Sequence, residues 1–321
     1  MVNNVCTPLV SVVIPTYGRI DFLEEAIQSV MNQTYKNVEI IVCDDNSQLP
    51  NVRQNVKEIV SKYPTCKLVE NKKNLGGALN RNEGIKVSKG ELISFLDDDD
   101  VYLPTRIEKV VELYLQNKQK KVGIIYTYCQ FTDENLNVRG EYCTEPSNNP
   151  LYKHMCGCLC ATSQWVIPKY VFDEVGMFEQ TPCKQDSIML LKVLGKFNCA
   201  LCVPEHLSLF RDHSGPRISE NFQKHLEGEN NYAIFLRQYY GLLTNPQVKH
   251  VEACIAKRML YNYSGLRDKA NILKCLEIIV HNDGITGLSM YDLLYVFASP
   301  QTYKKMYHLF KKSIEKLTKY I

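Results

Sequence analysis

Apolar residues in the first hundred positions form short continuous runs that alternate with helix-period patterns. Leu9 to Ile14 is a β-branched run closed by Pro15, and from Asp21 apolar residues recur at helical spacing as far as Val30. The same order repeats, with strand-like runs at 38–43, 67–70 and 91–96 and helical patterns at 52–60 and 77–87. This alternation predicts an α/β fold with a mainly parallel central sheet covered by helices on both faces.

The pattern becomes less regular from Val122 onward. Residues 122–131 look like a strand, residues 159–167 look extended, and after about Glu220 only long helical patterns remain. The sequence therefore predicts two parts, an α/β domain over 1–220 and a smaller helical C-terminal region over 221–321.

Composition narrows the classes of protein. The chain has 321 residues, 45% of them hydrophobic, which indicates a globular protein. A net charge of +3 is too balanced for the broad basic face of a nucleic-acid-binding protein. Thirteen cysteines are scattered instead of framing a short domain, which favours a reducing cytosol. No basic leader opens the chain and no apolar run reaches about 18 residues, so we expect a cytoplasmic protein, soluble or peripheral on a membrane.

Four adjacent carboxylates follow the apolar run ISFL at Asp97–Asp100. In parallel sheets, ligands bind at the carboxyl ends of the strands. Adjacent carboxylates repel one another unless a cation neutralises them, and oxygen ligands favour Mg²⁺ or Mn²⁺. If the segment is extended, Asp97 and Asp99 share one side. The alternative is a solvated acidic turn that starts the helix after Pro104.

A second polar strand end, Asp44-Asp45-Asn46-Ser47, is open to two interpretations. Asp and Asn are ordinary loop and helix-capping residues. A carboxylate here could instead accept the imide N–H of a uracil ring, which an apolar side chain cannot do.

Four segments occur in order with βα spacing between them: SVVIPTYGR, VCDDNS, NLGGALNRNEGI and GELISFLDDDD. Together they resemble the family 2 glycosyltransferases of the GT-A fold, over about residues 9–220. The resemblance implies a Rossmann-like nucleotide-sugar-binding domain. The implied nucleotide-sugar site contains Pro15, Tyr17, Asp45, Arg81, Asp97 and Asp98.

Within that site the resemblance implies a role for each group. Pro15, Tyr17 and Asp45 resemble the base pocket, Arg81 a contact to the base or diphosphate, and Asp97 the ribose partner. Asp99 resembles the metal ligand of the DXD motif. Without the resemblance, Tyr17 could equally be a packed aromatic and Arg81 a solvated helix residue.

Two further segments extend the resemblance. VGMF followed by KQD and a helical pattern is similar to the family's segment that carries the catalytic base, which indicates Asp186. The family's usual Glu-Asp pair is Gln185-Asp186 here, and Asp186 could instead cap the following helix. LFRDHSGPRIS resembles the segment that closes the domain, where His213 would help to hold the metal or diphosphate, or be structural.

These implied roles describe a metal-dependent inverting glycosyltransferase. It would transfer a sugar, with UDP favoured as the nucleotide because of Asp45, to a hydroxyl of a glycan or lipid-linked acceptor. By family analogy the setting is capsule, teichoic-acid or other surface-glycan synthesis. The alternatives are a nucleotidyltransferase, although PTYGR is poor in glycine for a triphosphate loop, and a non-catalytic carbohydrate-binding scaffold.

The C-terminal tail and a cysteine-rich stretch complete the sequence expectations. Residues 303–321 place apolar residues at three-to-four spacing and carry six lysines against one glutamate. This pattern fits either an anionic membrane surface or packing on the protein or a second subunit. Cys156, Cys158 and Cys160 lack the usual spacing of zinc-binding pairs, so we expect them to be small packing residues.

Overall fold

The computed structural model describes residues 7–213, 221–289 and 292–293. Contacts divide the chain into two units. The first comprises Met1–His154, Cys158–Thr181 and Gln185–Gly215, and the second comprises Met155–Gly157, Pro182–Lys184 and Pro216–Ile321. The expected boundary near residue 220 lies close to this division, but two short segments from the middle of the chain belong to the second unit. The basic helix expected over 303–321 lies outside the described residues.

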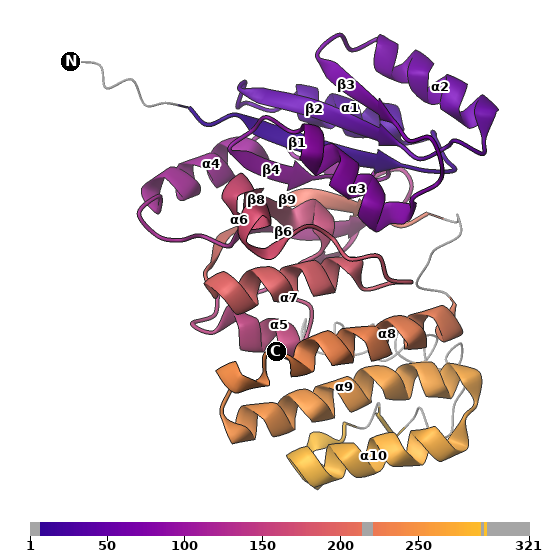
Figure 1. The fold of residues 1–321 in the computed structure, drawn as a ribbon, viewed down its shortest axis with the longest axis vertical. Helices are drawn as coiled ribbons and strands as arrows, with labels where there is room; N and C mark the ends of the chain where they lie inside the picture. Colours follow the sequence, from indigo (N-terminus) through magenta and orange to yellow (C-terminus); the bar gives the residue numbers. More distant parts are fainter. Residues whose placement is uncertain (1–6, 214–220, 290–291, 294–321) are drawn as a thin grey trace, which may run out of the picture. The chain divides into compact units, whose positions relative to one another are not determined.

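The described part of the first unit is an α/β structure built on one nine-stranded sheet (Figure 1). Its strands are β1 Val10–Thr16, β2 Val38–Asp44, β3 Cys66–Glu70, β4 Leu92–Phe95, β5 Val101–Tyr102, β6 Ile124–Thr132, β7 Val138–Tyr142, β8 Trp165–Pro168 and β9 Ala200–Arg211. Its helices are α1 Leu23–Met31, α2 Pro50–Ser61, α3 Gly76–Val87, α4 Arg106–Gln116, α5 Pro150–Cys156, α6 Lys169–Val175 and α7 Gln185–Phe197.

The sheet has a parallel part and a mixed part. Its order is β3-β2-β1-β4-β8-β6-β9-β5, with β7 paired to β6. The strands from β3 to β4 are all parallel, as the alternating pattern predicts. Beyond β4, the strand β8 is antiparallel to both β4 and β6, and β6 is parallel to β9. The extended segment expected over 159–167 is wrong in part, because a 3₁₀ turn at Thr162–Gln164 precedes a shorter β8.

Helices cover both faces of the parallel part because alternate strand residues point to opposite sides. Val10, Val12 and Ile14 of β1 pack in one core with α1, α2 and α4. Val13 faces the opposite side, against α3. There a Cβ on Gly84 would lie 2.4 Å from the Val13 side chain, so α3 approaches the sheet as closely as only glycine permits.

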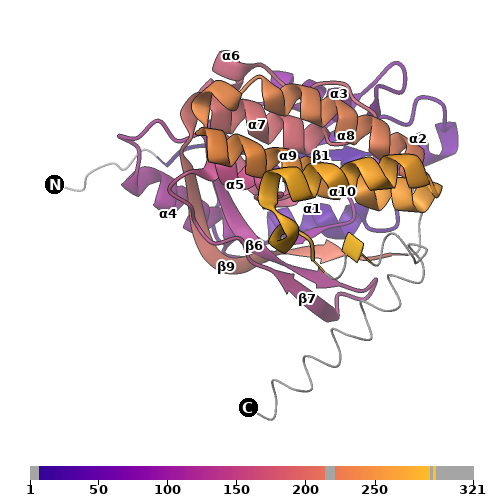
Figure 2. The same ribbon diagram turned by 90° about the horizontal axis from the view of Figure 1, so that it is seen from below.

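The described helices of the second unit are α8 Phe222–Arg237, α9 Asn245–Leu266 and α10 Lys269–Asp283, with short 3₁₀ turns at Tyr240–Leu242 and Ile285–Gly287. They lie side by side in both ribbon views (Figures 1 and 2). A small core of Ala256, Leu260, Ile272, Cys275 and Ile279 joins α9 to α10. Among the described residues, no helix has the length and apolar character needed to span a bilayer.

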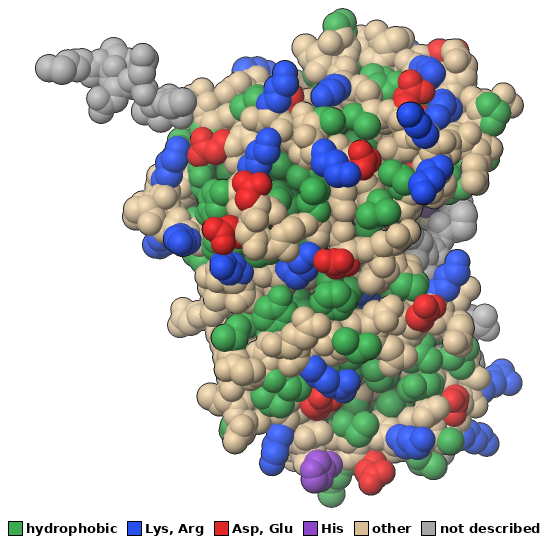
Figure 3. All heavy atoms as spheres, in the orientation of Figure 1, with side chains coloured by type: hydrophobic (Ala, Val, Ile, Leu, Met, Phe, Trp, Pro, Cys, Tyr) green, Lys and Arg blue, Asp and Glu red, His purple; other side chains and the backbone are tan. Residues whose placement is uncertain are grey.

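On the drawn face of the first unit, Lys and Arg side chains are interspersed with Asp and Glu (Figure 3). No continuous basic area forms on that face. A charged ligand would therefore be recognised by a local group of charged side chains. The densest such group in the sequence is the acidic segment after β4.

Candidate functional site

The acidic segment forms a turn at the carboxyl end of β4. Asp100 donates its backbone N–H to the Asp97 carbonyl at 3.0 Å, so Asp97–Asp100, here called the carboxylate turn, is not extended as the sequence suggested. The four side chains nevertheless form two pairs that differ in their exposure to solvent. Asp98 and Asp100 are buried, whereas the side chains of Asp97 and Asp99 are 35% and 15% exposed.

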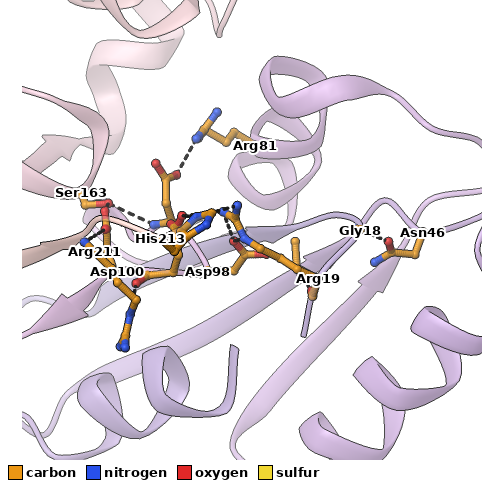
Figure 4. Close-up of polar contacts among 12 residues, drawn as sticks. Gly18, Arg19, Asn46, Arg81, Asp98, Asp100, Ser163, Arg211 and His213 are labelled. Atoms are coloured by element: carbon orange, nitrogen blue, oxygen red, sulfur yellow. Dashed lines mark hydrogen bonds and ion pairs between the residues drawn. The ribbon is translucent and has the colours of Figure 1, made fainter. Parts of the chain in front are cut away.

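Arg19, from the loop after β1, neutralises two carboxylates of the turn. Its Nη2 lies 2.8 Å from Asp98 Oδ1 and 2.7 Å from Asp99 Oδ2. Its Nη1 lies 3.1 Å from His213 Nε2, and that ring nitrogen lies 3.0 Å from Asp99 Oδ2. Figure 4 shows Arg19 and His213 converging beside Asp98. The structure thus brings together Asp98, Asp99 and His213, which the sequence had assigned to one site.

The buried members of the turn ionise with difficulty. Burial raises the pKa of Asp98 to about 6, although the Arg19 guanidinium opposes that rise. Burial and the neighbouring Asp99 and Asp97 charges raise the pKa of Asp100 well above its usual range. A cation close to the turn therefore stabilises it, and Arg19 supplies part of that positive charge.

Asp100 supports the turn from inside the protein. It accepts hydrogen bonds from Ser163 Oγ at 2.6 Å and from the Arg211 backbone N–H at 3.1 Å. The Asp97 backbone N–H donates to the same Ser163 Oγ at 3.1 Å, and Arg211 Nε donates to the Asp99 carbonyl at 2.9 Å. Ser163 and Arg211 therefore fix the backbone on which Asp97 and Asp99 are presented (Figure 4).

Arg81 reaches the turn from the first half of α3. Its Nη2 lies 2.5 Å from Asp97 Oδ1 (Figure 4). Burial lowers the pKa of Arg81, but the Asp97 charge and hydrogen bond, with a smaller contribution from Asp186, raise it overall. Arg81 is therefore a partly buried permanent cation between the carboxylate turn and the start of α7.

Asp186, the expected base, lies in the first turn of α7. Its Oδ1 accepts a hydrogen bond from the Ser187 backbone N–H at 2.7 Å, and the side chain is partly exposed. A Cβ on Gly77 would lie 3.2 Å from Arg81 Nη1 and 3.4 Å from Gln185 Oε1, so the starts of α3 and α7 are neighbours. The structure thus places Asp186 on the side of the site that Arg81 faces.

Asp45 has a structural role in the fold. Its carboxylate accepts hydrogen bonds from the backbone N–H groups of Leu75 and Gly76, at 2.8 to 3.0 Å, and from Asn71 Nδ2 at 2.9 Å. It is buried, and it therefore caps the N-terminus of α3. The uracil contact stays a prediction, and any base bound here must approach a carboxylate that already has three donors.

Pro15 and Tyr17 lie at the carboxyl end of β1. Pro15 pairs with Cys43 of β2 and is partly buried, whereas Tyr17 is 50% exposed. An exposed aromatic ring at this strand end is available for stacking. Its role in a base pocket stays a prediction.

The donor set suits a hard divalent cation. A carboxylate and an imidazole, Asp99 and His213, present ligand atoms 3.0 Å apart at the partly exposed side of the turn. Mg²⁺ and similar ions are commonly held by one or two protein ligands together with substrate phosphates. Asp99 and His213 therefore fit such an ion. Arg19 and the ion would both contact the carboxylates of the turn.

Sequence reasoning missed Arg19, Ser163 and Arg211. Arg19 had a usable signal, since it follows β1 directly and the ends of neighbouring parallel strands meet at one edge. Arg211 lies in the segment LFRDHSGPRIS, which was singled out only for His213. Ser163 had no signal, because it lies in the 3₁₀ turn before β8, whose place in the sheet the sequence does not reveal.

Comparisons with known proteins identify the family. The model of the family described as "Glycosyl transferase family 2" matches residues 11–170, which include most of β1, the carboxylate turn and β8. The chain belongs to the family 2 glycosyltransferases.

Several proteins named as glycosyltransferases are similar to this chain over part of its length. An uncharacterized glycosyltransferase of Methanocaldococcus jannaschii is 34% identical over 143 residues, covering 44% of this chain and 49% of that protein. One of Rickettsia prowazekii is 32% identical over 195 residues, covering 56% and 57%. The chain thus spans about half the length of these curated relatives.

Two further proteins are similar over most of this chain. An Escherichia coli protein, the UDP-Glc:alpha-D-GlcNAc-diphosphoundecaprenol beta-1,3-glucosyltransferase WfaP, is 26% identical over 260 residues, covering 75% of this chain and 95% of WfaP. The structure of S. aureus TarS 1-349 in complex with UDP-GlcNAc matches with a TM-score of 0.54 at 13% identity, covering 94% of this chain and 92% of that one. This confirms the GT-A fold of the glycosyltransferase.

Proposed function

We propose that this glycosyltransferase transfers a sugar, with inversion, from a UDP-sugar to a hydroxyl of a glycan or lipid-linked acceptor, with Mn²⁺ or Mg²⁺ at Asp99 and His213. The observation that carries the proposal is the carboxylate turn at the end of β4, where Asp99 and His213 meet beside Arg19. A leaving diphosphate needs positive charge, and this point combines one permanent cation with a pair of metal-compatible ligands.

Each residue would have a defined task. Arg19 and Arg81 would bind and orient the diphosphate, because both guanidinium groups face the turn. Asp97 would accept from a ribose hydroxyl, and Asp98 would hold Arg19 in place. Asp186 would accept the proton of the acceptor hydroxyl as that oxygen attacks the anomeric carbon. A divalent metal ion, when bound, supplies Lewis-acid stabilisation of the departing diphosphate. One base without a second nucleophile implies a single displacement.

The similar proteins support the choice of donor and acceptor. WfaP is named for transfer from UDP-Glc to a diphosphoundecaprenol-linked sugar, and TarS 1-349 was solved with UDP-GlcNAc. A UDP-sugar and a glycan or lipid-linked acceptor are therefore our first choice for this chain, in capsule, teichoic-acid or other surface-glycan synthesis. We further propose a cytoplasmic setting in which residues 303–321 bind an anionic membrane surface or a second subunit.

The donor proposal is tested by thermal shift with UDP-, GDP- and dTDP-sugars and with nucleoside triphosphates, each with and without Mn²⁺. A ligand that binds only the native state raises the melting temperature. We expect a Mn²⁺-dependent rise with UDP-sugars. A rise with a triphosphate alone would favour a nucleotidyltransferase, and no rise with any nucleotide would favour a carbohydrate-binding scaffold. Liposome flotation with and without residues 303–321 tests the membrane contact, and equal flotation would exclude it.

A further inference from the structure

Two thiols and an imidazole from distant parts of the sequence meet in the second unit. Cys156 is the last residue of α5, and His250 and Cys254 lie one turn apart on α9. Their ligand atoms, two Sγ and one imidazole nitrogen, all lie within 4.8 Å of one another. We call these three residues the thiol–imidazole cluster.

The distance between two of these atoms matches tetrahedral metal coordination. Cys254 Sγ lies 3.6 Å from His250 Nε2. Around a tetrahedral zinc ion with Zn–S of about 2.3 Å and Zn–N of about 2.1 Å, a sulfur and a nitrogen ligand lie about 3.6 Å apart. The two side chains thus have this separation without rearrangement.

The far side of the imidazole is held by a carboxylate. His250 Nδ1 lies 2.9 and 3.0 Å from the two carboxylate oxygens of Asp283, at the end of α10. This contact places the proton on Nδ1 and leaves Nε2, the atom that faces the thiols, as the acceptor. Metal-binding histidines almost always have such a carboxylate or carbonyl partner.

Arg258 of α9 fixes the backbone at Cys156. Arg258 donates to the Cys156 carbonyl at 3.3 Å and pairs with the buried Glu229 at 3.1 Å. Glu229 also pairs with Lys184 at 2.8 Å, so the two cations share one carboxylate.

We propose that Cys156, His250 and Cys254 bind a zinc ion, with Asp283 orienting His250 and a water molecule at the fourth position. Three protein ligands of S, S and N type select zinc over Mg²⁺ and Mn²⁺. The ion would tie the end of α5 to α9, and through Asp283 to α10. This site belongs to the second unit and does not depend on the proposed sugar transfer.

A second group in the described residues serves as a built-in comparison. Glu141, Cys143 and His206 of the first unit also bring ligand atoms within 4.8 Å. However, this group has one thiol, and two of its three residues are exposed. A metal bound there would have one thiolate ligand instead of two.

The test is a Co²⁺ titration of the reduced, metal-stripped full-length chain, followed by zinc competition. We expect one equivalent of Co²⁺ to give visible bands of tetrahedral coordination and a thiolate charge-transfer band, and zinc to abolish both. C156S and C254S should each lose the tetrahedral bands and about half of the charge-transfer intensity. D283N should bind about 10 to 100-fold more weakly with an unchanged spectrum, which a purely structural role for Asp283 would not produce.

Two matched variants control the assignment. C158S removes an exposed thiol two residues from Cys156, and C143S removes the thiol of the comparison group. Both should bind Co²⁺ as the parent chain does. Loss of the bands in C143S, their persistence in both C156S and C254S, or a Cys156–Cys254 disulfide in the chain as purified, detected by mass spectrometry, would each overturn the proposal.

Discussion

The carboxylate turn and the thiol–imidazole cluster are both groups of potential metal ligands, but they are built on different chemistry. The turn consists of oxygen ligands whose charge is already shared by Arg19 and Arg81. The cluster consists of sulfur and nitrogen ligands, with Asp283 hydrogen-bonded to its imidazole. We propose the first group for an ion that arrives with phosphate, and the second for an ion held by the protein itself.

This difference shows that the neighbouring side chains determine which ion or ligand each group can bind. At the turn, arginine side chains offer donors to an anionic ligand, so a metal there would bind most tightly together with a nucleotide. At the cluster, the ligands must lose protons to bind, so a metal there would depend on pH and would stabilise the helices. Perturbing one group should therefore leave the other unchanged.

The largest effect is expected from Asp186→Asn, which removes the proposed base. A positioned general base contributes about 10² to 10⁴-fold, so transfer should fall by that factor. Donor binding should stay near normal. Steady-state rates and nucleotide titration calorimetry measure both, and D173N on the exposed face of α6 is the control. Parental turnover by D186N would show that another group accepts the proton.

Asp99→Ala tests the metal side of the turn. Lewis-acid stabilisation of a phosphoryl oxygen is worth several kcal/mol, so Mn²⁺-dependent transfer should fall by about a hundredfold. Mn²⁺ should also cease to strengthen UDP binding in calorimetry, while cobalt binding at the cluster persists. D21N, at an exposed aspartate, is the control. Unchanged UDP affinity in the presence of Mn²⁺ would remove Asp99 from the ligand set.

Gly84→Ala should disturb the carboxylate turn through the fold. The added Cβ would lie 2.4 Å from Val13 and 2.9 Å from Cys43, so α3 must move away from the sheet. Overpacking of this kind costs about 1 to 3 kcal/mol, measurable by urea unfolding. Gly140, where a Cβ meets nothing within 4 Å, provides the control G140A. Equal stability of the two variants would mean that α3 is held less closely than described.

Arg19→Gln should produce the smallest change, and in the opposite direction. Because Arg19 shares Asp99 with the proposed metal, its removal should strengthen Mn²⁺ binding in the absence of nucleotide several-fold. Binding of the diphosphate should weaken at the same time. Calorimetry separates the two effects, and K120Q, at an exposed lysine, is the control. Weaker Mn²⁺ binding by R19Q would show that Arg19 supports the metal instead of competing with it.

The sequence predicted the parallel strands and the acidic strand end because both are encoded by consecutive residues. β1, β2 and β4 are continuous apolar runs, and the carboxylates follow β4 directly. The antiparallel pairing of β8 could not be predicted, since it depends on which strand edges remain free after the first four strands assemble. Ser163 precedes β8 and Arg211 ends β9, so both reach the site through the mixed part of the sheet.

Residues that have a plausible structural role were the hardest to assign to a functional site. Asp45 fitted both a helix cap and a base contact, and the structure shows the cap. Cys156 looked like a packing residue because its partners, His250 and Cys254, are far away in the sequence. The spacing of cysteine and histidine residues reveals metal sites whose ligands are close in sequence. It does not reveal sites whose ligands are brought together only by tertiary folding.

The second unit also includes Met155–Gly157 and Pro182–Lys184, two short segments from within the glycosyltransferase sequence. Within this unit Lys184 pairs with Glu229 of α8, and Arg258 of α9 holds the Cys156 carbonyl. A truncation after residue 220 would therefore leave these segments without partners. A chimera that exchanges the helices with those of a relative would have to carry three separate stretches of sequence.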